Sequence, residues 1–182
     1  FIVFQYFSLV YLVSSHKSNT NLAKKALKLA LDQHPNSSGL KLVQVEMYIY
    51  DEKLDLAEKM LNELHALEPR NEEIYIQRAT IFSKRNQHEK AIENLKIALA
   101  YTDDKPDVYN LLGMEYLFMD NLEDAKYNFM KCLEEDYEDQ TALYNVVYCF
   151  EFLDQNEDAI VYLEQYIDQN PYSEIAWHQL GR

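Results

Sequence analysis

Apolar side chains recur at intervals of three and four residues along much of the chain, which is the period of a helix with one buried face. One such face comprises Tyr109, Leu112, Gly113 and Tyr116. A short polar stretch follows at Met119-Asp120-Asn121, and a second face then comprises Ala125, Phe129, Cys132 and Leu133. The pattern predicts two helices joined by a short turn, which is a helical hairpin.

The hairpin pattern repeats at a constant length of 34 residues. Pro35 and Pro69 are 34 residues apart, and Pro171 follows Pro69 after three further periods. Alanines recur at the same spacing without insertion: Ala23, Ala57, Ala91, Ala125 and Ala159. A fixed period of this length indicates a repeat architecture. The spacing predicts one array over 1–182, with repeats at 4–37, 38–71, 72–105, 106–139 and 140–173 and a partial sixth at 174–182.

These repeats resemble the tetratricopeptide repeat, which has 34 residues and the pattern W-x2-L-G-x2-Y, A-x3-F, P. The fourth repeat carries the pattern at Tyr109, Leu112, Gly113, Tyr116, Ala125 and Phe129, and the sixth begins it at Trp177, Leu180 and Gly181. The resemblance implies an all-α fold, a right-handed α-solenoid of stacked antiparallel helix hairpins. Each hairpin would bury its remaining apolar surface on its neighbours.

Composition is consistent with this fold class. Glycine occurs 3 times and proline 4 times, which disfavours a fold with many tight turns and favours long helices with short links. Hydrophobic residues make up 48% of the chain, enough to bury a sizeable core.

The resemblance also implies a binding groove lined by the first helix of each repeat, at repeat positions 2, 5, 9, 12 and 13. The groove residues that we single out are Glu46, Tyr50, Ile76, Thr80, Asn110, Met114, Tyr144, Tyr148, Glu151 and His178. Leu42, Ile49, Leu117, Phe118 and Phe152 occupy groove positions as well. For the last three, packing against the next repeat remains an equal alternative.

The predicted groove is aromatic, apolar and acidic, and aromatic residues and Met are enriched at protein-binding surfaces. We therefore expect a protein or peptide partner, with the Asn110 side chain hydrogen-bonded to its backbone. The charge is uneven: the fourth repeat has two basic and ten acidic residues (−8), and the fifth has six acidic and no basic residues (−6). Although single acidic residues also serve to solvate helix ends, their sum favours a partner with apolar anchors and nearby Lys or Arg.

Several partner classes are disfavoured. A net charge of −14 opposes nucleic-acid binding, which needs a basic footprint. Some family members bind acidic C-terminal tails through Lys at position 5, a residue that no repeat here has at that position. The apolar run at residues 1–13 is shorter than the ~20 residues of a membrane-spanning helix, so we expect no membrane insertion. A cytoplasmic location fits the two cysteines, and Cys132 is predicted to be a buried hydrophobe rather than bonded to Cys149.

The sequence lacks motifs for catalysis. The five histidines are not at metal-ligand spacings, and the three glycines are too far apart for a phosphate loop. We predict a non-catalytic interaction scaffold without metal or cofactor. Three alternatives remain: a regulatory or substrate-docking arm of a larger enzyme, an RNA-reading helical array, which the charge opposes, and self-association through exposed repeat ends.

Overall fold

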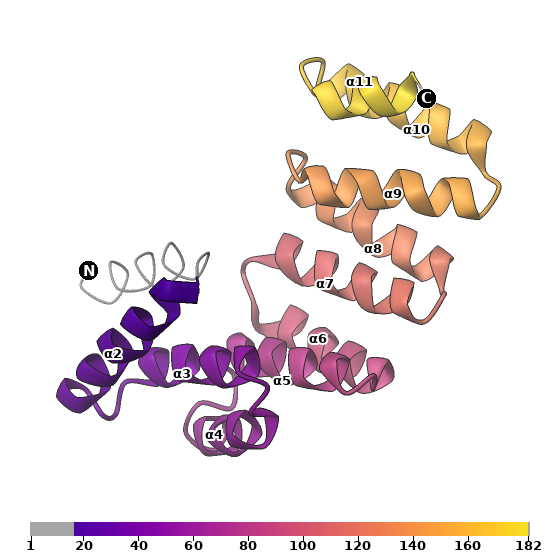
Figure 1. The fold of residues 1–182 in the computed structure, drawn as a ribbon. Helices are drawn as coiled ribbons and strands as arrows, with labels where there is room; N and C mark the ends of the chain where they lie inside the picture. Colours follow the sequence, from indigo (N-terminus) through magenta and orange to yellow (C-terminus); the bar gives the residue numbers. More distant parts are fainter. Residues whose placement is uncertain (1–16, 182) are drawn as a thin grey trace. The chain divides into compact units, whose positions relative to one another are not determined.

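The computed structural model describes residues 17–181, and side chains from residue 21 onward; no strand occurs in this part of the chain. The helices are α2 (Lys17–Gln33), α3 (Ser38–Tyr50), α4 (Leu54–Leu67), α5 (Glu72–Lys84), α6 (His88–Tyr101), α7 (Lys105–Phe118), α8 (Leu122–Glu135), α9 (Gln140–Phe152), α10 (Asn156–Gln169) and α11 (Glu174–Leu180) (Figure 1).

The chain divides into two compact units. Unit 1 extends to Ile81 and unit 2 begins at Phe82, so the division falls within α5. In unit 1, α3 contacts α2 and α4. In unit 2, α7 contacts α6 and α8, and α9 contacts α8, α10 and α11, so that consecutive helices form antiparallel hairpins (Figure 1).

The helix boundaries confirm the all-α fold of helical hairpins. Second helices begin at Leu54, His88, Leu122 and Asn156, each one repeat length after the one before. First helices begin within one residue of the predicted repeat starts from 38 onward. Helix α2 is the second helix of the first repeat. The predicted first helix of that repeat and the apolar run at 1–13 lie outside the described residues.

The turn inside each hairpin has the same backbone conformation. Its second residue has a left-handed φ of 55–58°, at Glu52, Asn86, Asp120 and Asp154. In the fourth repeat, the Asn121 N–H donates to the Tyr116 carbonyl (2.9 Å), and the Asp120 N–H donates to the Leu117 carbonyl (3.0 Å). This pair of bonds is the Schellman motif, which usually has glycine at the left-handed position. Here an L-residue occupies it every time.

Side-chain caps start most of the first helices, again with a period of 34. The side chains of Ser37, Asn71, Asp139 and Ser173 each accept a hydrogen bond from a backbone N–H in the first turn of the next helix. Such caps satisfy donors that the helix itself leaves unpaired. Helix α7 differs, because its N-cap Asp104 makes no side-chain cap bond and Pro106 occupies its first turn.

The predicted packing positions form the core. All five periodic alanines are buried, with exposed fractions of 0–6%. Gly113 shows why small residues are needed there: a Cβ on Gly113 would lie 2.6 Å from Cε1 of the buried Phe129 ring. Helix α7 therefore approaches α8 more closely than any side chain at position 113 would allow.

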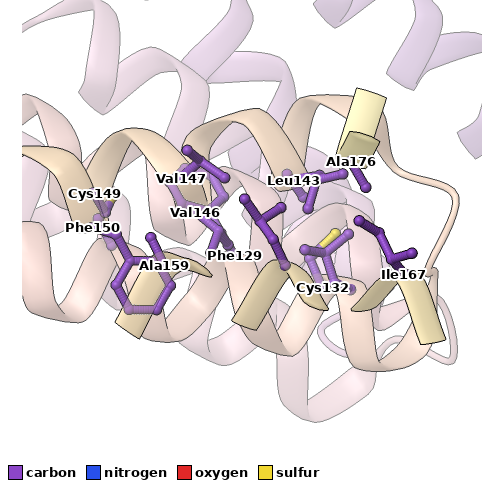
Figure 2. Close-up of a cluster of buried hydrophobic side chains, with 14 residues drawn as sticks. Phe129, Cys132, Leu143, Val146, Val147, Cys149, Phe150, Ala159, Ile167 and Ala176 are labelled. Atoms are coloured by element: carbon purple, nitrogen blue, oxygen red, sulfur yellow. The ribbon is translucent and has the colours of Figure 1, made fainter. Parts of the chain in front are cut away.

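The C-terminal core joins four helices. Phe129 and Cys132 from α8 pack with Leu143 and Val146 from α9, and with buried residues of α10 and α11 (Figure 2). Unit 1 has its own cluster, which includes Val45, Leu61 and Ile74, all fully buried. Because neighbouring hairpins contribute residues to a shared core, no single hairpin would bury its apolar face alone.

Candidate functional site

The predicted groove residues all lie on first helices. Glu46 and Tyr50 are on α3, Ile76 and Thr80 on α5, Asn110 and Met114 on α7, Tyr144, Tyr148 and Glu151 on α9, and His178 on α11. The first two helices contribute to unit 1 and the last three belong to unit 2. The two sets are therefore described separately.

In unit 1, the predicted residues differ in accessibility. Tyr50 is 64% exposed, and Ile76 and Thr80 are half-buried. The Thr80 hydroxyl donates to the Ile76 carbonyl (3.1 Å) within α5. Leu42 and Ile49 are buried in the unit 1 cluster, because the helix face that carries them packs against neighbouring helices. They support the fold and are not available to a ligand.

Glu46 forms a polar network with two residues of α5. The Gln77 side-chain nitrogen donates to Glu46 Oε1 (3.1 Å) and to Glu73 Oε1 (2.9 Å). Desolvation by surrounding protein, followed by the neighbouring Glu73 carboxylate, raises the pKa of Glu46 to about 7, against the opposing effect of the Gln77 hydrogen bond. Sequence reasoning missed Gln77, although its spacing of four from Glu73 places both on one helix face.

In unit 2, Asn110 and Met114 connect α7 to α9. The Asn110 side-chain nitrogen donates to Asp139 Oδ2 (3.2 Å), and its Oδ1 is buried without a partner. The Asn145 side-chain nitrogen lies 3.6 Å from the Met114 sulfur. The Asn110 amide nitrogen is thus already used within the protein, and its oxygen, although unpartnered, is shielded from solvent.

An aromatic surface continues from these contacts. It comprises Phe118 on α7 and Tyr144, Tyr148 and Phe152 on α9. Phe118, Tyr144 and Phe152 are 59%, 51% and 65% exposed, so none of them is buried in the core, and the Phe118 ring lies against the His88 ring, with centroids 5.4 Å apart. Tyr148 is half-buried and its ring stacks on Phe152, with centroids 4.3 Å apart. Leu117, by contrast, packs against the core.

The spacing of these residues makes the surface continuous along each helix. Asn110, Met114 and Phe118 are four residues apart on α7, and Tyr144, Tyr148 and Phe152 are four apart on α9. Because Asn110 and Met114 contact α9 or its cap, the two stripes lie side by side. Glu151 and His178 are exposed on α9 and α11.

Acidic groups gather at the start of α7 and α9. The pKa of Asp107 is raised by partial burial and then by the carboxylates of Asp104, Asp139 and Asp136. The two lysines of the fourth repeat pair with nearby acids, Lys126 with Glu123 (2.7 Å) and Lys131 with Glu134 (2.5 Å). The negative charge predicted from the sequence therefore includes a group of four aspartates near Asp107 that lie close enough to interact.

A pocket of about 790 Å³ lies at the turns that precede α9 and α11. Its lining is aromatic, polar and acidic and includes Tyr137, Glu138, Tyr166, Tyr172 and Glu174. The Tyr166 hydroxyl donates to the Tyr137 carbonyl across it, and Tyr172 is 94% exposed. This pocket was not predicted, because the turns that form it come from different repeats.

Two histidines and both cysteines contact other groups of the protein or are buried. Among the described residues, no group of three His, Cys, Asp or Glu side chains is placed to hold a metal ion. His88 Nδ1 lies 2.8 Å from Glu115 Oε2, and the His65 ring packs edge-on against Tyr75. Cys132 and Cys149 are free, buried thiols, and burial raises the pKa of Cys132 to about 12 and that of Cys149 to about 11. His16 lies outside the described residues.

No helix in the described part of the chain is both long and apolar enough to cross a membrane.

Comparison with known proteins supports the repeat assignment. Tetratricopeptide repeat models match residues 106–139 and 141–173. No curated protein sequence matches the chain. Similar solved structures include MamA, with 19% identity over 94% of this chain and 95% of MamA, at a TM-score of 0.65. The tetratricopeptide repeat protein TTC0263 of Thermus thermophilus has 24% identity over 70% of this chain and 71% of its own, at a TM-score of 0.63. A chain of the APC/C hetero-tetramer Cut9–Hcn1 has 16% identity over 91% of this chain and 33% of its own, at a TM-score of 0.68. At these identities the similarity concerns the fold.

Proposed function

Because the chain belongs to the tetratricopeptide repeat family, we propose that it is a protein-interaction scaffold whose aromatic surface binds a segment of another protein. The aromatic surface is the observation that carries this proposal. Phe118, Tyr144 and Phe152 leave more than half of their surface in solvent, while the neighbouring Leu117, Leu143 and Tyr148 pack against the core. Exposed aromatic groups gathered on one face are typical of binding surfaces.

The surface is suited to binding an extended or helical segment. The stacked rings of Tyr148 and Phe152 restrain each other, which lowers the entropy lost when a ligand contacts them. Tyr144 is 51% exposed and offers a ring face and a hydroxyl to a ligand. The partner segment would insert aliphatic or aromatic side chains between α7 and α9.

The charge of unit 2 favours basic residues beside the apolar anchors of the partner segment. Unit 2 carries eight Lys or Arg residues against 21 Asp or Glu residues, a net charge of −13. A segment with Lys or Arg beside its apolar anchors would be attracted to this unit, whereas an acidic segment would be repelled. The role of the chain is to hold such a segment, without a chemical step of its own.

Selection from a library of displayed peptides tests the proposal. Peptides selected on the immobilised chain should contain an aromatic or large aliphatic residue together with Lys or Arg. The Tyr144→Ala, Phe152→Ala double variant should bind the selected peptides at least tenfold more weakly. A fall of this size is expected because truncating a central aromatic contact commonly costs about 2 kcal/mol or more.

The matched control is Tyr127→Ala, which removes an equally exposed tyrosine (57%) from the second helix α8. It should leave the affinities unchanged. Selected peptides that bind the double variant as well as they bind the unmodified chain would refute the aromatic surface as the binding site. A selection dominated by acidic peptides would refute the proposed partner chemistry.

A further inference from the structure

Glu46, Glu73 and Gln77 form an acidic cluster in unit 1 that no ion pair among the described residues neutralises. Both carboxylates contact the same Gln77 nitrogen, at 3.1 and 2.9 Å, so the two oxygens are no farther apart than these two distances combined. Within the described part of the chain, neither Glu46 nor Glu73 is paired with a basic side chain. Two like charges this close are unfavourable unless a positive charge or a proton separates them.

The Gln77 amide is the second unusual feature of the cluster. The residue is only 4% exposed, and its Oε1 is buried without a hydrogen-bond partner. A buried acceptor that lacks a donor costs free energy, and such atoms are rare in folded proteins. The cluster therefore has two carboxylates that lack a cation and one amide oxygen that lacks a donor.

We propose that this cluster, formed by Glu46, Glu73 and Gln77, is a binding site for a primary ammonium group, namely a lysine side chain of the partner protein. An ammonium group has three donors and no acceptor. Two of them would bond to the carboxylates in place of the Gln77 nitrogen, and the third would bond to Gln77 Oε1 once the amide has turned over to present its oxygen. Glu46 is exposed enough to be reached from solvent, so the site is open on one side.

Lysine fits the site better than arginine. Its charge is compact and can lie between two neighbouring carboxylates, whereas the planar guanidinium of arginine is shaped for two parallel bonds to one carboxylate. Among the described residues, the two carboxylates also lack the third acidic or histidine ligand that would suit a divalent metal ion.

The inference rests on the proposed scaffold function, since it names a chemical group of the partner. Its location is nevertheless independent, because the cluster belongs to unit 1 and the aromatic surface to unit 2. The two proposals can therefore fail separately.

A titration followed by NMR tests the ammonium site in the full chain. The probes are the peptide acetyl-Ala-Lys-Ala-amide and its neutral counterpart with norleucine in place of lysine. The lysine peptide should shift the Gln77 side-chain NH₂ resonances and the Glu46 carboxyl carbon, and the norleucine peptide should not. Bound ammonium should also lower the pKa of Glu46, so that binding at pH 7 releases up to about half a proton in calorimetry with two buffers.

The variants Glu46→Gln and Glu73→Gln should each weaken binding of the lysine peptide at least tenfold. They keep the shape of the side chain, and each removes one of two repelling charges, so the protein should remain folded. Glu63→Gln, at an exposed position on α4, is the matched control and should bind as the unmodified chain does. Equal binding of the two peptides, or unchanged binding by both cluster variants, would overturn the proposal. If peptides selected through the aromatic surface still bound these variants, the scaffold function would stand without the lysine site.

Discussion

At Gly113 the packing of the repeat leaves no room for a side chain. The missing Cβ is what allows the Phe129 ring to lie against the backbone of α7. Gly113→Ala should destabilise the protein by roughly 1–3 kcal/mol, because the ring or the helix must move. Urea unfolding would measure this change.

Two further variants locate the cause of that loss. In the double variant Gly113→Ala, Phe129→Leu, the cost should be smaller than the sum of the two single costs, since the smaller side chain makes room for the methyl group. Gly181→Ala should be nearly neutral, because a Cβ there meets nothing closer than 3.5 Å. Additive effects of the two core variants would contradict the contact.

Glu46 makes stability depend on pH in a predictable direction. Its pKa of about 7 lies above the usual value of 4.5, so between these values the folded chain binds more protons than the unfolded chain. Stability from this group therefore falls as pH rises from about 4.5 through 7. At pH 8, Glu46→Gln should be more stable than the unmodified chain, by about 1 kcal/mol once solvent screening of a partly exposed group is allowed for.

Urea unfolding at pH 5 and pH 8 measures the effect. The difference between the variant and the unmodified chain should appear at pH 8 and nearly vanish at pH 5, where Glu46 is protonated in the fold. A variant that is less stable at pH 8 than at pH 5, relative to the unmodified chain, would contradict the raised pKa.

At the scale of the helical elements, the turns inside the hairpins share a left-handed residue, and none of the four described turns has glycine there. Left-handed backbone costs an L-residue roughly 1 kcal/mol, and glycine avoids this cost. Asp154→Gly should therefore stabilise the protein by about 0.5–1 kcal/mol, helped by removing a negative charge from the C-terminal end of α9.

Thermal and urea unfolding of two control variants separate the effect of the backbone conformation from the effect of the charge. Asp154→Asn removes the charge while keeping an L-residue, so it should give a smaller gain. Glu164→Gly places glycine inside α10 and should cost about 1 kcal/mol. If Asp154→Gly destabilised the protein as much as Glu164→Gly does, the left-handed turn would not exist in solution.

The helices and packing residues were predictable because they depend on local spacing. A repeat length of 34 with apolar residues at intervals of three and four fixes which faces are buried, and Ala125, Phe129 and Cys132 are buried as expected. The aromatic surface was harder to predict, because the sequence pattern was equally consistent with packing and with exposure of Phe118 and Phe152. Their exposure is set by how adjacent hairpins pack.

Contacts between repeats were not predictable from spacing. The amide of Asn110 bonds to Asp139 at the cap of the next repeat's first helix, and Gln77 bonds to Glu46 in the preceding repeat. Both depend on the distance between hairpins that are separate in the sequence. The repeat frame shows which residues share a helix face, but it does not show which side chains from neighbouring helices meet.

At the scale of the whole molecule, charge is the dominant asymmetry. Unit 2 carries −13 of the net −14, so unit 1 is nearly neutral. Association of a basic peptide with the aromatic surface should therefore slow markedly as salt is raised from low to physiological concentration, while dissociation changes little. Stopped-flow mixing measures both rates. A neutral peptide with the same apolar residues should show no such dependence, and equal salt dependence of the two peptides would exclude electrostatic attraction by unit 2.

Site-specific photo-cross-linking tests the central claim most directly. A photoreactive phenylalanine analogue would replace Tyr144 on the aromatic surface in one sample and Tyr127 on α8 in another, and each would be irradiated in a lysate of the source cells. Our account predicts a discrete cross-linked partner from position 144, lost when a selected basic peptide is added, and none from position 127. Cross-links to the same partner from position 127 but not from position 144 would show that the partner binds the second helices, and would contradict the proposed surface.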